Sequence, residues 1–216
     1  SINQANRNAG DGISLTQVAD GAAATIGSLL SRMRELATQS ASGTLGTTER
    51  SYLDQEFISL RSEIDRISTT TEYNGQPLLS GSSNTFEVFI GFKSGSGNSW
   101  NVAVADLDVA AVGLTGASVS TAVAAQSMLA NIDSAISAVA TARANYGSIQ
   151  SRFEVAIQNL TVTAENFTAA ESRIRDADIA QETSVFTKNQ ILTQSGIAIL
   201  AQANSLPQQA LALLRG

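Results

Sequence analysis

The chain has 216 residues, enough for one or two domains, and a net charge of −6 with its thirteen Lys and Arg residues scattered. No basic stripe is available for nucleic-acid phosphates, and no apolar run approaches the roughly 20 residues of a membrane span. Because cysteine and histidine are absent, disulfides and thiolate metal sites are excluded and the commonest general base is missing. We therefore expect partners other than nucleic acid or a membrane.

Two apolar repeats predict a pair of helices over residues 1–42 and 47–71. The seven-residue repeat of the first is Leu15, Ala22, Leu29 and Leu36, and the second carries Leu53, Phe57, Leu60, Ile64 and Ile67. A glycine can end the first helix at Ser42–Gly43, and Thr47 is a suitable N-cap for the second. Because the connection is short, the two helices should lie antiparallel.

The apolar period then changes to two residues. Tyr73-Asn74-Gly75 is a turn signal, after which apolar residues alternate at Phe86, Val88, Ile90 and Phe92 and again at Trp100, Val102 and Val104. This alternation predicts a β-hairpin over residues 85–105, with its loop at 94–98, packed on the helices by one face. Residues 106–123 have weak periodicity, and we interpret them as a connector.

A long seven-residue repeat follows the connector. Its members are Ile132, Val139, Tyr146, Phe153, Leu160, Phe167 and Ile174. The repeat predicts one helix over 126–177 whose apolar seam is largely covered by the two N-terminal helices. A second repeat of Leu192, Ile199, Leu206 and Leu213 predicts a C-terminal helix over 179–216, which Pro207 should kink or divide.

The predicted fold class is mainly α: a long antiparallel helical rod or bundle with a small β-hairpin, plus a C-terminal helix. We assign residues 1–178 to the rod and 179–216 to a separate terminal domain. No catalytic group is recognisable, because Lys93 and Lys188 lie in no Ser–Lys motif and Asp176 with Asp178 fits a solvated helix junction. We expect neither enzyme activity nor a cofactor or metal.

Several segments of the chain resemble bacterial flagellins. They are Asn8–Ser14 (NAGDGIS), Arg32–Ser40 (RMRELATQS), Glu63–Ile67 with Tyr73–Gly75, Ser172–Asp178 (SRIRDAD) and Gln190–Leu192 with Leu200–Asn204 (LAQAN). They stand in the order of the family and cover nearly the whole chain, so together they are specific. The resemblance implies a structural, motility-related subunit of the extracellular flagellar filament, exported through the flagellar secretion apparatus without a cleaved signal peptide.

The resemblance also implies a set of partners. The rod corresponds to the D1 domain and the C-terminal helix to D0, which together form the homopolymer. In the family an N-terminal helix, which we expect to be missing here, covers the C-terminal one, so the chain resembles a truncated fragment. The segment after Ala180, with Leu192, Ile199, Leu206 and Leu213, is then expected to be mobile, re-packed or bound to another partner. The resemblance implies that the secretion chaperone of the family binds this same segment.

Further partners implied by the resemblance are hook-associated or cap proteins and a host innate immune receptor. The positions matching the receptor-recognition segment are Arg32, Leu36 and Glu56. Leu36 also belongs to the apolar seam, so the sequence leaves its exposure open. Two alternative functions also stay open: a hook–filament junction protein, and a signalling coiled-coil rod, which would not carry the hairpin or the LAQAN segment.

Overall fold

The computed structural model describes residues 1–81, 85–91, 97–175 and 179–214, with side chains described up to Asn204. It contains two compact units, Ser1–Ala164 and Glu165–Gly216. This division precedes the predicted boundary at 178/179, because the buried part of the long helix ends at Leu160. Each unit is described by itself below.

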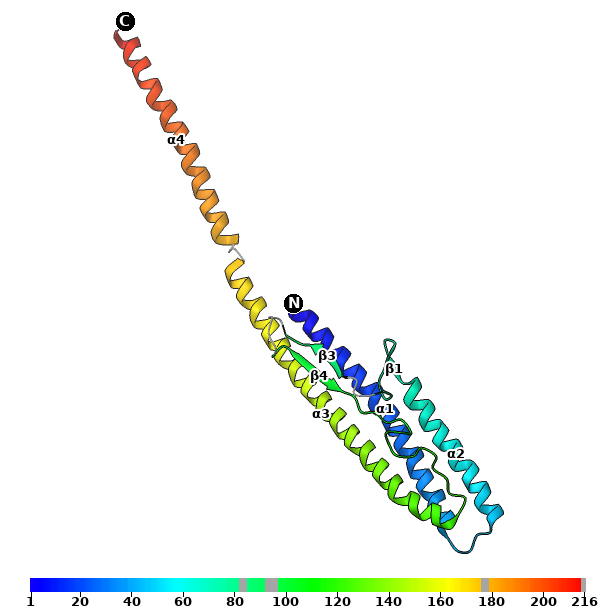
Figure 1. Cartoon of the computed structure of the whole chain (residues 1–216). Coiled ribbons are helices and arrows are strands. Elements are labelled where there is room, and N and C mark those ends of the chain that lie inside the picture. Colours follow the sequence, from blue (N-terminus) through cyan, green and yellow to red (C-terminus); the bar gives the residue numbers. More distant parts are fainter. Residues whose placement is uncertain (82–84, 92–96, 176–178, 215–216) are drawn as a thin grey trace. The chain divides into compact units, whose positions relative to one another are not determined.

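The first unit is built around two antiparallel helices, α1 (Ile2–Ala41) and α2 (Thr47–Thr70), as Figure 1 shows. One stripe of α1 is buried along its whole length at intervals of seven residues: Ala5, Gly12, Ala19, Ile26, Met33 and Ser40. A side chain every seven residues returns to nearly the same face of a helix. The stripe is therefore the axis of the core, and small residues on it let neighbouring elements approach closely.

The turn between α1 and α2 is closed by Arg50, which is buried although it is charged. Its guanidinium donates hydrogen bonds to the carbonyl oxygens of Ser40 (2.8 Å), Leu45 (2.6 Å) and Ser42. The C-terminal end of α1 carries a partial negative charge, so a guanidinium is favoured beside it.

The N-cap of α2 is Gly46, and the expectation of Thr47 there was wrong.

Two small antiparallel sheets follow α2. Strands β1 (Glu72–Tyr73) and β2 (Gln76–Pro77) flank Asn74 and Gly75, whose φ values of 53° and 76° match a type I′ turn. Strands β3 (Thr85–Phe89) and β4 (Ser99–Ala103) form the predicted hairpin, with Val88 opposite Trp100. Phe92 and most of the predicted loop lie outside the described residues.

The β3–β4 hairpin packs against the helices through aromatic side chains. The Trp100 ring centroid lies 5.4 Å from that of Phe153 and 4.5 Å from the guanidinium carbon of Arg152. The Phe153 ring lies against Gly12 of α1, where a Cβ atom would be 2.7 Å from the ring. The Tyr146 hydroxyl accepts a hydrogen bond from the Ala105 N–H at 2.9 Å. These contacts fix the hairpin on α1 and the long helix.

The connector is held to α1 and α2 by hydrogen bonds on both sides of Val119. The Asp54 carboxylate accepts from the Val119 N–H (2.6 Å) and the Ser118 hydroxyl (2.8 Å), and the Ser40 hydroxyl donates to the Val119 carbonyl. The long helix α3 (Ala122–Arg175) then begins earlier than the predicted residue 126. The Thr121 hydroxyl accepts the Ala124 N–H at 3.2 Å, which is the contact of an N-cap that the prediction missed.

The apolar seam of α3 is buried from Ile132 to Leu160. Beyond that point the expectation of a largely covered seam was wrong, because Phe167 is 57% exposed and Ile174 is 88% exposed. The change occurs at the level of the first turns of α1, where Asn6 donates a hydrogen bond to the Thr161 hydroxyl. The intrachain cover of the seam extends as far as the buried residues of α1 do.

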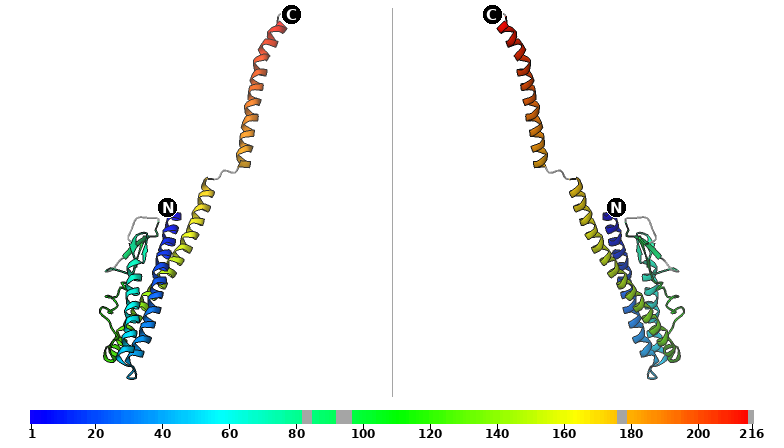
Figure 2. Two further views of the ribbon diagram at one scale, coloured as in Figure 1. Left: turned by 90° about the vertical axis from the view of Figure 1, so that its right-hand side faces the viewer. Right: turned by 90° about the vertical axis from the view of Figure 1, so that its left-hand side faces the viewer.

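The second unit consists of the end of α3 and the helix α4 (Ile179–Leu214). The backbone of α4 is helical on both sides of position 207, so of the two expected effects of Pro207, a kink or a division of the helix, the division does not occur. A proline inside a helix removes one backbone hydrogen bond, and a helix of this length can continue past that loss. Asp176 and Asp178 lie outside the described residues. Two further views of the chain are given in Figure 2.

Candidate functional site

Among the side chains that the structure describes, the apolar face of α4 is the largest set of exposed large hydrophobic residues on one element. We use this name for Val185, Phe186, Ile191, Leu192, Ile197, Ile199 and Leu200, all of which are exposed. Burying one such side chain is worth about 1.5–3 kcal/mol, so a face of this kind favours association. Of the four positions predicted from the heptad, Leu192 and Ile199 lie on it, and the side chains of Leu206 and Leu213 are outside those described.

The sequence prediction selected only one stripe of this helix. Phe186, Ile191, Ile197 and Leu200 are exposed beside it and were missed. They stand one or two positions from heptad residues, so they widen the apolar surface around the helix rather than extend the stripe. The signal in the sequence that would have identified them is that hydrophobic residues occur on several sides of this helix, because such helices are usually buried on several sides.

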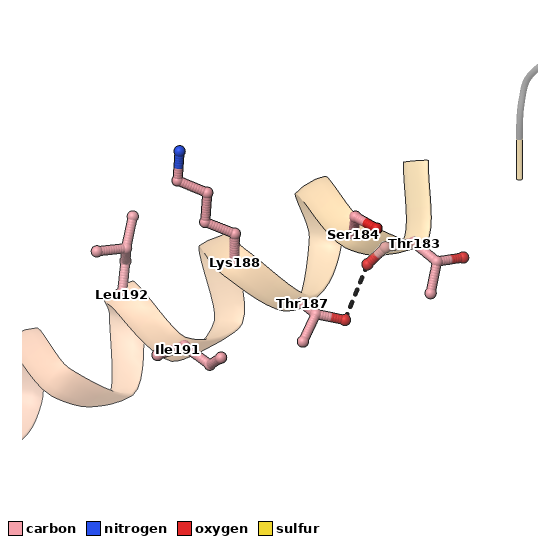
Figure 3. A pocket seen from close by; sticks show the side chains of 6 residues that line it. All are labelled: Thr183, Ser184, Thr187, Lys188, Ile191 and Leu192. Carbon is pink, nitrogen blue, oxygen red and sulfur yellow. Dashed lines mark hydrogen bonds between the residues drawn. The ribbon is translucent and has the colours of Figure 1, made fainter. Parts of the chain in front are cut away.

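A groove of about 450 Å³ runs along the start of α4 and contains polar groups. It is lined by Thr183, Ser184, Thr187, Lys188, Ile191 and Leu192, all from this one helix (Figure 3). Lys188 and Leu192 project from the same side, and the Thr187 hydroxyl donates to the Thr183 carbonyl at 2.8 Å. That bond is an ordinary contact within a helix, and it leaves the threonine without an activating base. The groove has the geometry of a packing surface.

The residues predicted for receptor recognition lie at one level of α1 and α2. Arg32 bonds Glu56 of α2 (2.8 Å) and Glu35 of its own helix (2.9 Å), and all three side chains are exposed. The hydrogen bond to Glu35, followed in size of effect by the one to Glu56, raises the pKa of the Arg32 guanidinium. Leu36 is 1% exposed, which assigns it to the core and answers the question that the sequence left open.

Within the described residues, no group of three or more acidic, cysteine or histidine side chains is placed to hold a metal ion. No helix in the same residues is both long and apolar enough to cross a membrane. The described surface carries exposed ion pairs and the apolar face of α4, and exposed apolar area of this kind is typical of protein–protein contact.

Comparison with known proteins assigns the family. Residues 1–84 match the family model of the bacterial flagellin N-terminal helical region, and residues 129–214 match that of the bacterial flagellin C-terminal helical region. A flagellin of Halalkalibacterium halodurans is 42% identical over 214 residues, which cover 99% of this chain and 79% of that protein. The chain belongs to the flagellin family.

Two further relatives place the flagellin fold and its role. A flagellar filament core protein of Treponema maltophilum is 36% identical over 99% of this chain and 79% of its own length. The crystal structure of Bacillus cereus flagellin is 31% identical, with a TM-score of 0.64 over 76% of this chain and 94% of that one. This flagellin is a structural subunit that polymerises with other flagellin subunits into the extracellular flagellar filament. The junction-protein and signalling-rod alternatives are not favoured.

Proposed function

We propose that the apolar face of α4 is the surface through which this flagellin is held in the filament, where side chains of neighbouring subunits cover it. The observation that carries the proposal is the contrast between the two units. The seam of α3 is buried up to Leu160 within the first unit, whereas Leu192 and Ile199 on α4 are exposed. Apolar area that a chain leaves uncovered is a driving force for assembly.

Replacing Ile199 with serine tests this proposal. Ile199 is 66% exposed in the single chain, so the change should leave the fold of the first unit intact and weaken polymerisation. Gln194→Ser on the same helix is the matched control. Sedimentation and negative-stain electron microscopy should show filaments for the wild type and the control and an increased soluble fraction for Ile199→Ser. Equal yields of filament from all three chains would contradict the proposal.

The same face suits a protein that must be kept from polymerising before export. We extend the proposal to a secretion chaperone that covers Leu192, Ile199, Leu206 and Leu213, and to hook-associated or cap proteins that meet the ends of the filament. Export is proposed to use the flagellar apparatus without a cleaved signal peptide. In the assembled filament we assign residues 1–178 to the rod and 179–216 to the terminal domain. A chaperone that binds Ile199→Ser as tightly as the wild type would argue against a shared face.

We also propose that the chain has no catalytic activity. The groove in Figure 3 supports this part of the proposal, because its hydroxyl groups lack a neighbouring base and its single ammonium group belongs to Lys188. Assays of the purified chain for hydrolysis of ester, peptide and phosphate substrates should show no turnover. Turnover that co-purifies with the chain and is lost in a Lys188→Met variant would overturn this assignment.

Recognition by a host innate immune receptor is proposed to use the exposed pair Arg32 and Glu56. Leu36 is buried, so its part is to hold α1 in the core rather than to contact the receptor. The double variant Arg32→Ala with Glu56→Ala should lower receptor activation, while Arg34→Ala with Asp133→Ala, an exposed pair between α1 and α3 at 2.6 Å, is the matched control. Full activity of the first double variant would remove Arg32 and Glu56 from the recognition surface.

A further inference from the structure

A groove of about 420 Å³ lies between the β3 strand, the β1–β2 turn and the α1 helix of the first unit. Four consecutive residues of β3 line it, from Phe86 to Phe89, and no residue of β4 does. The groove therefore runs along the edge of β3 that faces away from β4. Figure 1 shows the two strands next to each other. Gly12 and Leu15 of α1 contribute its buried floor.

The backbone of β3 presents hydrogen-bonding groups to this groove. In an antiparallel pair, alternate residues direct both their N–H and C=O groups toward the partner strand or away from it. The Ile90 and Gly91 N–H groups both donate to the Asn98 carbonyl, at 2.8 and 2.9 Å, which marks a bulge just after β3. Within β3, on the regular side of this bulge, the alternation that starts from Ile90 directs Val88 and Phe86 toward β4. Odd-numbered residues face the other way, and accordingly the Phe89 carbonyl accepts from the Asn8 side-chain amide at 2.8 Å. The N–H and C=O of Glu87 face the groove by the same rule.

Glu87 is thus the centre of a strand edge that is open to a further strand. Among the hydrogen bonds of the described residues, no side chain contacts the backbone groups of Glu87, whereas Asn8 occupies the Phe89 carbonyl. Exposed strand edges pair readily with extended chains, and main-chain hydrogen bonds then provide the affinity. The nearby exposed Phe89 ring adds an apolar contact for one alternate side chain of such a segment.

The charge of the groove selects among extended segments. Its ionisable lining residues are Asp11 on α1 and Glu87 on β3, both exposed and both acidic, and its lining contains no basic side chain. The chain itself has thirteen basic and nineteen acidic residues, so its own segments provide no excess of positive charge for this lining. From the open edge and the acidic lining, we propose that the groove binds an extended segment of a partner protein that carries basic side chains, by adding it as a strand to β3.

The test uses the full chain at a concentration where it is monomeric and a fluorescein-labelled peptide of alternating Val and Lys. Its comparison is the same peptide with Glu in place of Lys. Anisotropy should show binding of the Lys peptide that is at least about tenfold tighter than that of the Glu peptide and weakens with added salt. Hydrogen exchange should show that the Lys peptide protects the Glu87 amide.

Two variants separate the backbone and charge contributions. Glu87→Pro removes an N–H that faces the groove rather than β4, so the hairpin should persist and peptide binding should be lost. The double variant Asp11→Asn with Glu87→Gln should weaken binding of the Lys peptide roughly two- to tenfold. The control double variant Asp65→Asn with Glu154→Gln changes acidic residues outside the groove and should have no effect on binding. Fluorescence of Trp100, the only tryptophan, reports whether the hairpin is folded in each variant.

Three results would overturn the proposal. The first is equal affinity for the Lys and Glu peptides, or no binding of either at millimolar peptide. The second is binding of the Lys peptide without protection of the Glu87 amide. The third is protection of that amide by raising the concentration of the chain alone, which would make a second copy the occupant.

Discussion

Replacing Arg50 with methionine should destabilise the first unit by about 2–4 kcal/mol. Methionine keeps much of the packing volume of the stem but cannot donate to the three carbonyl oxygens that Arg50 contacts, those of Ser40, Ser42 and Leu45. Among the described residues no carboxylate pairs with Arg50, so its charge is balanced by these carbonyls and by the C-terminal end of α1.

The size of the destabilisation depends on which carbonyl oxygens are left without any hydrogen-bond donor, from protein or water, after the substitution. Hydrogen bonds from a charged donor contribute about 1.5–3 kcal/mol each, but an exposed acceptor regains water when the donor is removed. Ser42 is exposed and Leu45 is half-buried, whereas the bond to the Ser40 carbonyl is buried. The variant therefore loses about one full buried bond and part of two others. Against a typical stability of about 5–15 kcal/mol, this is a large fraction.

Urea denaturation followed by Trp100 fluorescence measures the effect, because this single tryptophan belongs to the first unit. The midpoint should fall by about 1–2 M for a slope typical of small domains. Arg34→Met is the control, since Arg34 is exposed and its ion pair among the described residues is with Asp133 on the surface. A midpoint for Arg50→Met that matches that of Arg34→Met would refute the argument that Arg50 holds the turn.

Two further changes probe the packing of the hairpin. Gly12→Ala places a Cβ about 2.7 Å from the Phe153 ring and should cost about 1–3 kcal/mol in the same denaturation, with partial recovery in a Phe153→Leu background. Tyr146→Phe leaves the Ala105 N–H without its acceptor and should cost about 1–2 kcal/mol. Burial raises the pKa of Tyr146, so its stabilising effect is present below pH of about 10 and is lost as pH rises through the higher folded value. The wild-type midpoint should therefore fall more steeply than that of Tyr146→Phe once the pH rises above about 10. Parallel curves would disprove that reasoning.

The helices were predictable because their apolar residues recur every seven positions. The repeats placed Leu36, Phe57 and Phe153 correctly in the core. They could not say where the cover ends, because Leu160 and Phe167 occupy equivalent positions in sequence while one is buried and the other is 57% exposed. Burial depends on how far the neighbouring helix extends, which is a property of the tertiary structure.

Two structural residues were missed although each stands seven residues before a buried apolar residue. Gly12 is seven residues before Ala19, and Arg50 is seven before Phe57. A residue without a side chain and a charged residue at apolar positions are exceptions to the pattern, and each marks a specific contact. Gly12 admits the Phe153 ring, and Arg50 caps the turn.

The apolar face of α4 was only partly predicted for a different reason. A heptad analysis selects the stripe of Leu192 and Ile199, which suits contact with one partner helix. Phe186, Ile191 and Ile197 are exposed around this stripe and widen the surface. Their contribution becomes visible only when the exposure of each side chain is known, which the sequence pattern alone does not state.

The accessibility of position 199 in the dispersed chain and in the filament tests the central claim most directly. The chain contains no cysteine, so Ile199→Cys provides a single site for labelling with a maleimide. The account predicts rapid labelling of the dispersed chain, close to the rate in denaturant, and strong protection in filaments isolated from cells that express the variant. Labelling at the same rate in both states would contradict the claim that the apolar face of α4 is buried by assembly.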